Sequence, residues 1–230
     1  MVCKLLYNKL LLYQRYNNNR IQVFLPVDYV EITIFAELKI FCINHYMTIN
    51  KTDIEGVVII EPQVFGDSRG YFFESFHEER YAETLGLRNR FVQDNESRSR
   101  YGVVRGLHFQ KPPYAQAKLI RVVYGEVLDV AVDIRRSSPT FGRYVAVRLS
   151  ADNHRQLYLP RGMAHGFSVL SSDVIFQYKC DNYYHPESEG AIAWNDPALA
   201  IDWQLPAGDV ILSDKDSRNP LLADIVSLFE

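Results

Sequence analysis

One histidine near the middle of the chain lies among residues that could support proton transfer at carbon. His108 sits in an alternating apolar run, with Arg105 three residues before it and Lys118 ten residues after it. An imidazole beside fixed cations is suited to taking a proton from a carbon next to a carbonyl, because the cations stabilise the enolate that forms. A lone inward histidine is more often a hydrogen-bonded core residue, so the rest of the chain must decide.

The run around His108 predicts a strand over residues 104–110. Alternation with period 2 defines two faces, one with Arg105, Leu107 and Phe109, the other with Val104, Gly106 and His108. We therefore expect His108 to point toward whatever packs behind Gly106, a residue with no side chain to block a close approach.

Further polar residues could contribute chemistry, although each alone has a structural explanation. Lys118 shares a strand face with Ile120 and Val122, where an ammonium needs a partner or a ligand. Tyr178 shares the face of Phe176, and a buried phenol also needs a partner. The remaining candidates lie in segments that resemble turns or loops: Arg69 in 65–70, the polar run 93–96, His165 in 160–167, and Asp216 in 212–216.

The composition is that of an ordinary globular protein. The 230 residues are 47% hydrophobic and 23% charged, and the net charge of -3 gives no reason to expect nucleic-acid binding. No apolar run approaches the ~18–20 residues of a membrane span, so no membrane association is expected. Cys180 is the only cysteine in the part expected to fold, which favours a reducing, cytoplasmic location.

Residues 1–46 differ from the rest. They combine basic, asparagine and scattered apolar residues without a sustained period. We expect an N-terminal extension of unknown role, produced by a start assigned upstream of Met47; the alternative is an extra strand or helix packed on the body. Residues 47–230 are expected to form the functional domain.

The body is expected to be all-β. Short strands are predicted at 71–76, 118–124, 127–134, 144–149, 156–159, 167–170 and 174–180, separated by glycine- and proline-containing turns. One helix is predicted from Glu78 to Leu85, ended by Gly86. Even strand spacing favours a sandwich or barrel, and best of all a double-sheet jelly roll with a few short helices.

Residues from about Met47 to Leu222 resemble the dTDP-4-dehydrorhamnose 3,5-epimerases, which are cupin-type jelly rolls (double-stranded β-helices). The resemblance rests on the segments 65–76, FVQDN at 91–95, VRGLHFQ at 104–110, GEVLDVAVDIR at 125–135, SPTFG at 138–142, AHGF at 164–167, NYY at 182–184 and WND at 194–196. The first 46 residues have no counterpart in it.

The resemblance implies catalytic roles. His108 would be the base, Asp216 the carboxylate that orients it, and Tyr178 the acid on the opposite face of the sugar. Lys118, with Arg105 nearby, would stabilise the enolate at the C4 oxygen, and His165 would contact substrate. The implied reaction is epimerisation at C3 and C5 of dTDP-4-dehydro-6-deoxy-D-glucose, giving dTDP-4-dehydro-L-rhamnose without a cofactor.

The resemblance also implies how the nucleotide half is bound. Lys215 and Arg69 would suit the pyrophosphate, and either Tyr183 or Tyr184 would stack on thymine. The other implied substrate contacts are Glu74, Gln93, Asp94, Asn95 and Glu189. The protein is expected to be a homodimer in which Arg69 and Glu74 serve the neighbour's site.

Alternative functions remain open from the sequence. Metal-binding cupins carry a second histidine two residues from the first, whereas Gly106 and Gln110 flank His108 here. We therefore expect no metal, which disfavours a dioxygenase. A C3-only epimerase or ketoisomerase on a related dTDP-4-keto sugar is the alternative within the fold, and Tyr178 favours double epimerisation over it. A non-catalytic sugar-nucleotide-binding jelly roll is disfavoured by an opposed base and acid.

Overall fold

The computed structural model describes residues 2–7, 10–17, 20–24, 46–87, 90–225 and 229, with side chains from residue 46 onward. Two compact units are present, Met1–Cys42 and Ile43–Glu230.

The first unit contains a three-stranded antiparallel sheet with the order β1 (Val2–Tyr7), β2 (Leu10–Asn17) and β3 (Arg20–Phe24). The sequence showed no sustained period here, and it left open whether residues 1–46 contain an extra strand or helix; strands are present. Aromatic and β-branched residues such as Tyr13, Tyr16, Ile21 and Val23 favour strands even without strict alternation. Asn17 of β2 pairs with Arg20 of β3.

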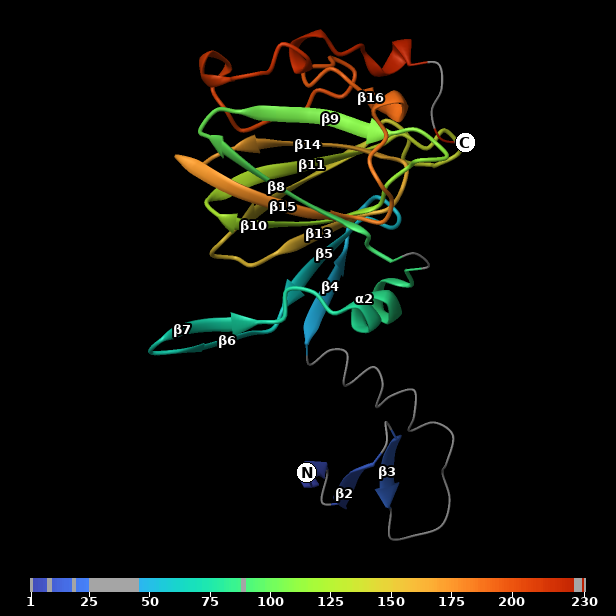
Figure 1. The fold of residues 1–230 in the computed structure, drawn as a ribbon, viewed down its shortest axis with the longest axis vertical. Helices are drawn as coiled ribbons and strands as arrows, with labels where there is room; N and C mark the ends of the chain where they lie inside the picture. Colours follow the sequence, from blue (N-terminus) through green and yellow to red (C-terminus); the bar gives the residue numbers. More distant parts are fainter. Residues whose placement is uncertain are drawn as a thin grey trace. The chain divides into compact units, whose positions relative to one another are not determined.

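The second unit is a double-sheet jelly roll, as predicted (Figure 1). One sheet has six strands in the order β4 (Met47–Lys51), β5 (Val58–Pro62), β13 (Gln156–Leu159), β10 (Lys118–Tyr124), β15 (Asp173–Cys180) and β8 (Gln93–Arg100). The other has five, in the order β12 (Tyr144–Ser150), β11 (Glu126–Asp133), β14 (Met163–Val169), β9 (Val104–Gln110) and β16 (Glu189–Ala191).

Two hydrophobic cores hold these sheets in place. The first lies between them and includes Ile120 and Phe176 from one sheet and Leu149 and Phe167 from the other. The second lies on the outer face of the five-stranded sheet, where the C-terminal segment covers it (Figure 1). Strand β11 contributes to both: Leu128, Val130 and Val132 enter the outer core and Ala131 the inner one. Each fully buried valine or leucine side chain contributes about 1.5–3 kcal/mol to folding.

The predicted helix is present at its predicted bounds, as α2 (Glu78–Leu85). Gly86 ends it with a φ of 65°, in the left-handed region that favours glycine. The side chain of Tyr81 is fully buried in a third apolar cluster that contains Leu119 of β10. The helix therefore packs on the outer face of the six-stranded sheet.

A separate hairpin projects from the body (Figure 1). It consists of β6 (Val64–Asp67) and β7 (Gly70–Phe73), which form a two-stranded sheet of their own. The predicted strand 71–76 is thus shorter than expected, and Phe65 lies in a strand rather than a turn. Phe65, Tyr71 and Phe72 are 51%, 61% and 70% exposed, so this arm carries an unusual amount of uncovered aromatic surface.

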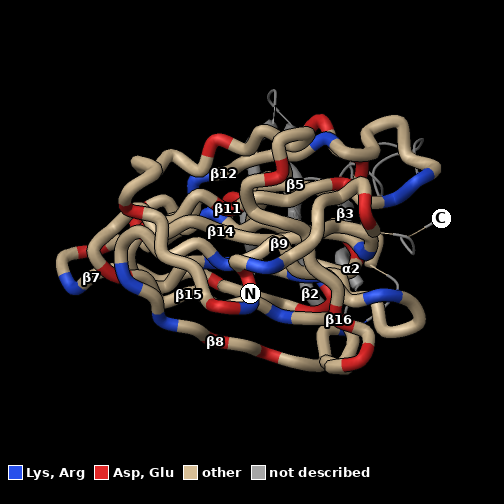
Figure 2. Tube along the Cα trace, turned by 90° about the horizontal axis from the view of Figure 1, so that it is seen from above, with Lys and Arg blue, Asp and Glu red and all other residues tan. Residues whose placement is uncertain are grey.

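Strand β8 was not predicted, because its first four residues read as a polar loop. It forms one edge of the six-stranded sheet, and its charged residues alternate (Figure 2): Asp94, Glu96, Arg98 and Arg100 are all exposed. An edge strand needs few apolar residues, and its charges discourage pairing with another chain. The alternation was present in the sequence but marked an exposed face instead of a buried one.

Candidate active site

A cavity of about 460 Å³ opens between the two sheets of the jelly roll. Its lining contains most of the residues that the sequence identified: Asn95, Arg105, His108, Lys118, His165, Tyr178, Tyr184, Glu189 and Asp216. These residues come from both sheets and from the C-terminal segment, so the fold brings together side chains more than 100 residues apart in sequence.

A β-bulge in β9 places two of them on the same wall. His108 pairs with His165 and Arg105 pairs with Phe167, so three steps along β9 match two along β14. The expected alternation therefore fails at this point, because Arg105 and His108, predicted on opposite faces, both line the cavity. Val104 belongs to the outer core with Leu107 and Phe109, and Val104 and Phe109 also border the cavity.

Glycines make this bulge possible. Gly106 has a φ of 132°, and a Cβ there would lie 2.5 Å from the Cα of Gly166 on β14. A Cβ on Gly166 would lie 2.6 Å from the carbonyl oxygen of Arg105. The close approach behind Gly106 was expected, and it is the backbone of β14 that occupies the space.

His108 is bound by Asp216, as the resemblance implied. Its Nε2 lies 2.6 Å from Oδ1 of Asp216, while the Ser213 hydroxyl donates to Oδ2 at 2.9 Å. Burial opposes ionisation of Asp216, but hydrogen bonds from His108, Ser213 and Asn219 keep its pKa below the usual value. Among the described residues, Nδ1 of His108 has no hydrogen-bond partner. The carboxylate thus fixes one ring nitrogen and leaves the other available.

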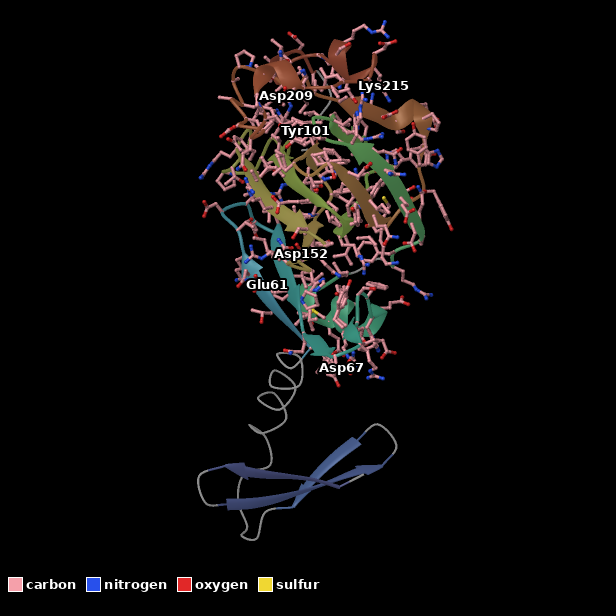
Figure 3. All side chains as sticks on the ribbon, turned by 90° about the vertical axis from the view of Figure 1, so that its left-hand side faces the viewer. Glu61, Asp67, Tyr101, Asp152, Asp209 and Lys215 are labelled. Carbon is pink, nitrogen blue, oxygen red and sulfur yellow. The ribbon has the colours of Figure 1, made fainter. Side chains whose placement is uncertain are left out.

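The C-terminal segment reaches His108 because it is tied to the start of β9. Ile211 donates its N–H to the carbonyl of Gly102 and accepts from the N–H of Val104. Tyr101 and Asp209, joined by a 3.0 Å hydrogen bond, anchor the same segment at the surface (Figure 3). This anchoring sets Asp216 at its distance from the strand.

Tyr178 and Lys118 lie on the opposite sheet from His108. They belong to the adjacent strands β15 and β10, and the Lys118 ammonium is 5.4 Å from the Tyr178 ring centre. Burial lowers the pKa of Lys118, although the carboxylates of Asp129 and Glu189 oppose this. Burial raises the pKa of Tyr178 to about 12. The phenol therefore remains protonated at neutral pH, which the acid role implied by the resemblance requires.

A second histidine–carboxylate pair adjoins the first. Nε2 of His165 lies 3.0 Å from both carboxylate oxygens of Asp129, and both side chains are buried. Burial lowers the pKa of His165 despite the carboxylate. Strand β14 begins earlier than predicted, so His165 lies within the strand rather than at its start. The role of Asp129 was missed; the signal was a carboxylate in an otherwise apolar strand, which requires a partner.

Polar residues form a network at the rim of the cavity. Glu189 accepts from the Tyr184 hydroxyl at 2.9 Å and lies 2.6 Å from the Lys215 ammonium. Burial opposes ionisation of Glu189, but these two bonds lower its pKa. Tyr184 lines the cavity, whereas Tyr183 does not. The structure thus favours Tyr184 where the sequence left the two tyrosines equivalent.

Besides Tyr183 and Lys215, four predicted substrate contacts do not line the cavity of their own chain. Arg69 is at the tip of the β6–β7 hairpin, paired with Asp67, and Glu74 pairs with Arg80. Asp94 faces outward in an ion pair with Lys179. Gln93 instead accepts a hydrogen bond from the N–H of Tyr184 at 3.1 Å.

Neither a metal-binding cluster nor a membrane-spanning helix is found within the described residues. No group of three or more histidine, cysteine, aspartate or glutamate side chains there is arranged to hold a metal ion. No helix in the same part of the chain is long and apolar enough to cross a membrane.

Comparison with known proteins places this arrangement in a family. Residues 51–224 match the family model for dTDP-4-dehydrorhamnose 3,5-epimerase. The Escherichia coli K12 enzyme of that name is 54% identical over 182 residues, covering 79% of this chain and 98% of its own.

Solved structures agree with this match. A Legionella pneumophila dTDP-6-deoxy-D-glucose-3,5-epimerase, in complex with dTDP-4-keto-L-rhamnose, is 56% identical with a TM-score of 0.76, covering 78% of this chain and 95% of its own. A 3′-monoepimerase from Streptomyces bikiniensis, in complex with dTDP-quinovose, is 35% identical with a TM-score of 0.70, covering 76% and 87%. The chain belongs to the dTDP-4-dehydrorhamnose 3,5-epimerase family of isomerases.

Proposed function

We propose that this protein inverts C3 and C5 of dTDP-4-dehydro-6-deoxy-D-glucose, giving dTDP-4-dehydro-L-rhamnose in the biosynthesis of dTDP-L-rhamnose. The observation that carries the proposal is the pair of opposed groups in one cavity. His108, bound to Asp216, lies on the five-stranded sheet, and Tyr178 lies on the six-stranded sheet. Inversion requires a proton to leave one face of a carbon and another to arrive on the opposite face.

The base acts first in this mechanism. Asp216 holds the Nε2 proton of His108, so the free Nδ1 accepts the proton from the substrate carbon. The electron pair of the broken C–H bond moves onto the C4 carbonyl oxygen and forms an enolate. The ketone acidifies both of its neighbours, C3 and C5, so a single site can treat each in turn without a cofactor.

Cations and the phenol complete each inversion. The Lys118 ammonium, with Arg105 on the facing wall, stabilises the enolate oxygen. Tyr178 then gives its hydroxyl proton to the carbon from the opposite face, and the C4 carbonyl re-forms. His165, held by Asp129 through Nε2, contacts the substrate from beside the base.

The nucleotide half occupies the rim. Tyr184 stacks on thymine, and Lys215 binds the pyrophosphate, while Glu189 holds both side chains in position. Asn95 lines the same cavity from β8. Gln93 and Asp94 remain proposed contacts, with Gln93 placed to act through Tyr184.

We propose further that the protein is a cytoplasmic homodimer. Arg69 and Glu74, which lie outside the cavity of their own chain, would complete the partner's site. The exposed aromatic residues of the β6–β7 hairpin support this, because burial against a second copy would remove them from water.

Mixing variants tests the dimer. An Arg69→Ala chain mixed with a His108→Ala chain should regain activity, since one site of the heterodimer receives both intact residues. A His108→Ala and Asp216→Ala mixture is the matched control; both residues come from one chain, so it should stay inactive. No rescue after verified subunit exchange would exclude the arrangement.

The catalytic unit is proposed to be residues 47–230, with residues 1–46 dispensable. The family match begins at residue 51, after the first unit has ended. A chain lacking residues 1–46 should keep full activity, measured as turnover beside the intact protein; a large loss would assign the first unit a role.

Isotope incorporation tests the reaction itself. The protein is incubated with dTDP-4-dehydro-6-deoxy-D-glucose in deuterated water, and the label is located by NMR. Deuterium at C3 and C5 supports the proposal. Label at C3 alone would instead indicate a C3-only epimerase, the activity named for the Streptomyces bikiniensis relative, and no label would indicate a binding protein.

A further inference from the structure

Gln110 connects two loops at the mouth of the cavity. One follows β9 and contains Tyr114; the other follows β15 and contains Tyr183 and His185. Gln110 is the last residue of β9 and only 5% exposed. Its Nε2 donates to the carbonyl oxygens of Tyr114 at 3.1 Å and Tyr183 at 3.2 Å, and its Oε1 accepts from the N–H of His185 at 2.6 Å. Two donors and one acceptor match two carbonyls and one N–H, so only one orientation of the amide satisfies all three.

These bonds bracket Tyr184. Gln110 holds the carbonyl of Tyr183 and the N–H of His185, while Gln93 of β8 accepts from the N–H of Tyr184 itself at 3.1 Å. Two glutamines, one from each sheet, thus fix three consecutive positions of the loop. A further contact joins the two loops, since the rings of Tyr114 and His185 stack at 3.5 Å.

The orientation of the Tyr184 side chain depends on these hydrogen bonds to the loop backbone. Tyr184 is 48% exposed, and within the described residues its side chain has one hydrogen bond, from its hydroxyl to Glu189. Little apolar packing therefore restrains the ring. Its orientation toward the cavity follows from where the loop places its Cα.

We propose that Gln110 is a positioning residue for the nucleobase subsite: it holds the loop so that the Tyr184 ring is preorganised to stack on the base. The inference rests on the proposed function, in which Tyr184 contacts the thymine. Because Gln110 acts on the base end of the substrate, it should affect binding of the nucleotide and leave proton transfer at the sugar unchanged. Preorganisation gives affinity by removing the cost of ordering the loop on binding.

Two variants separate the contributions of Gln110. Gln110→Met keeps the length of the side chain and removes every hydrogen bond. Gln110→Glu keeps an acceptor for the N–H of His185, loses both donors, and serves as the second variant if the methionine chain does not fold. For either, we expect the Kd for dTDP and the KM for the dTDP-sugar to rise roughly tenfold, about the loss of one base–aromatic stack, with kcat within about twofold of wild type.

Asn153 provides a matched control on the β12–β13 loop. Its side-chain amide also bonds three backbone groups, the N–H of Ser150, the N–H of Arg155 and the carbonyl of Arg148, but it does not line the cavity. Asn153→Ala should therefore lower thermal stability without changing the Kd for dTDP. An equal rise in Kd for Asn153→Ala and Gln110→Met would mean that general loosening of the fold explains the effect.

A double-mutant cycle with Tyr184→Ala decides whether Gln110 acts through the ring. Once the ring is absent, replacing Gln110 should weaken dTDP binding by less than twofold, measured by calorimetry. Additive losses would mean that Gln110 touches the ligand directly, and a wild-type Kd in both Gln110 variants would mean that it does nothing for the base; either overturns the inference. Failure of the proposed function is distinct, because the wild-type protein itself would then neither bind dTDP nor exchange deuterium.

Discussion

Replacing Asp216 by asparagine should inactivate the base by giving His108 the wrong tautomer. In the present arrangement Oδ1 of Asp216 accepts the Nε2 proton of His108 at 2.6 Å, and Oδ2 accepts the proton of the Ser213 hydroxyl at 2.9 Å. The Ser213 oxygen also accepts the backbone N–H of Asp216 at 3.1 Å, so its single proton points at Oδ2. In the Asp216→Asn chain we expect the new amide oxygen to face Ser213 and the amide NH2 to face His108, which gives up the 3.5 Å bond from Asn219 to Oδ1.

A donor facing Nε2 forces the His108 proton onto Nδ1, the nitrogen that should accept from substrate. A correctly placed general base contributes roughly 10²–10⁴-fold, and we expect kcat in deuterium exchange to fall by that factor. The KM should change little, because Asp216 is 5% exposed and its two carboxylate oxygens are bound to His108 and Ser213. The double variant with His108→Ala should be no slower than His108→Ala alone, since the two side chains act as a unit.

Removing the Ser213 hydroxyl tests this reasoning directly. In a Ser213→Ala, Asp216→Asn chain the amide is free to turn its oxygen toward His108 and restore the Nε2 proton. This second change should recover part of the lost exchange rate, about tenfold, although Ser213→Ala alone should slow the enzyme. Deuterium exchange at C3 and C5, followed by NMR, measures all three variants. A further loss in the double variant, or near-normal activity of Asp216→Asn, would refute the tautomer argument.

Three other predictions follow from the same structure. Tyr178→Phe should still exchange substrate hydrogen for deuterium but form inverted product slowly; equal loss of both would give the phenol a structural role. Burial lowers the pKa of Lys118 from 10.5 and raises that of Tyr178 to about 12, so the alkaline fall in kcat/KM should begin below pH 10.5 and move upward in Lys118→Arg; an unmoved profile would exclude Lys118 as its origin. Burial opposes ionisation of Asp133, but hydrogen bonds from Arg135, Ser138 and Thr140 lower its pKa from 3.8 to about 2. This shift stabilises the folded state by about 2 kcal/mol. The stabilisation is present above pH 3.8 and is lost as the pH falls through about 2. In urea unfolding, Asp133→Asn should lose about that free energy at pH 7 and show a weaker dependence on pH below 4; an unchanged midpoint would exclude the linkage.

The inner strands were predictable because both of their faces are buried. The bounds of β10 and β13 match the expectation, and in β11 Leu128, Val130 and Val132 share a core as the alternation indicated. The helix was equally clear, because Tyr81 and Leu85 lie one turn apart and Gly86 ends it. Where burial requires apolar residues, their spacing in the sequence predicts the element directly.

The edges and irregularities were not predictable in the same way. Strand β8 lies at a sheet edge, so water replaces the apolar neighbours that would have marked it as a strand. The bulge at Gly106 adds one residue to β9 without disturbing the apolar pattern, and it alone puts Arg105 on the wall that carries His108. Asp216 lies 108 residues from His108, and no local period connects them; the family resemblance supplied that pairing.

The opposed arrangement of the proposed base and acid is a consequence of the jelly roll. The interior of a double sheet has two walls, and alternation along each strand makes every second side chain point into the space between them. His108 from β9 and Tyr178 from β15 therefore face one cavity from opposite sides. Phe167 and Phe176, stacked at 4.1 Å, belong to the inner core and form part of the cavity wall, an apolar surface that strengthens the electrostatic effect of Lys118. A single-sheet scaffold would have to place both groups on one face, so proton removal and return from opposite sides depend on the two-sheet architecture itself.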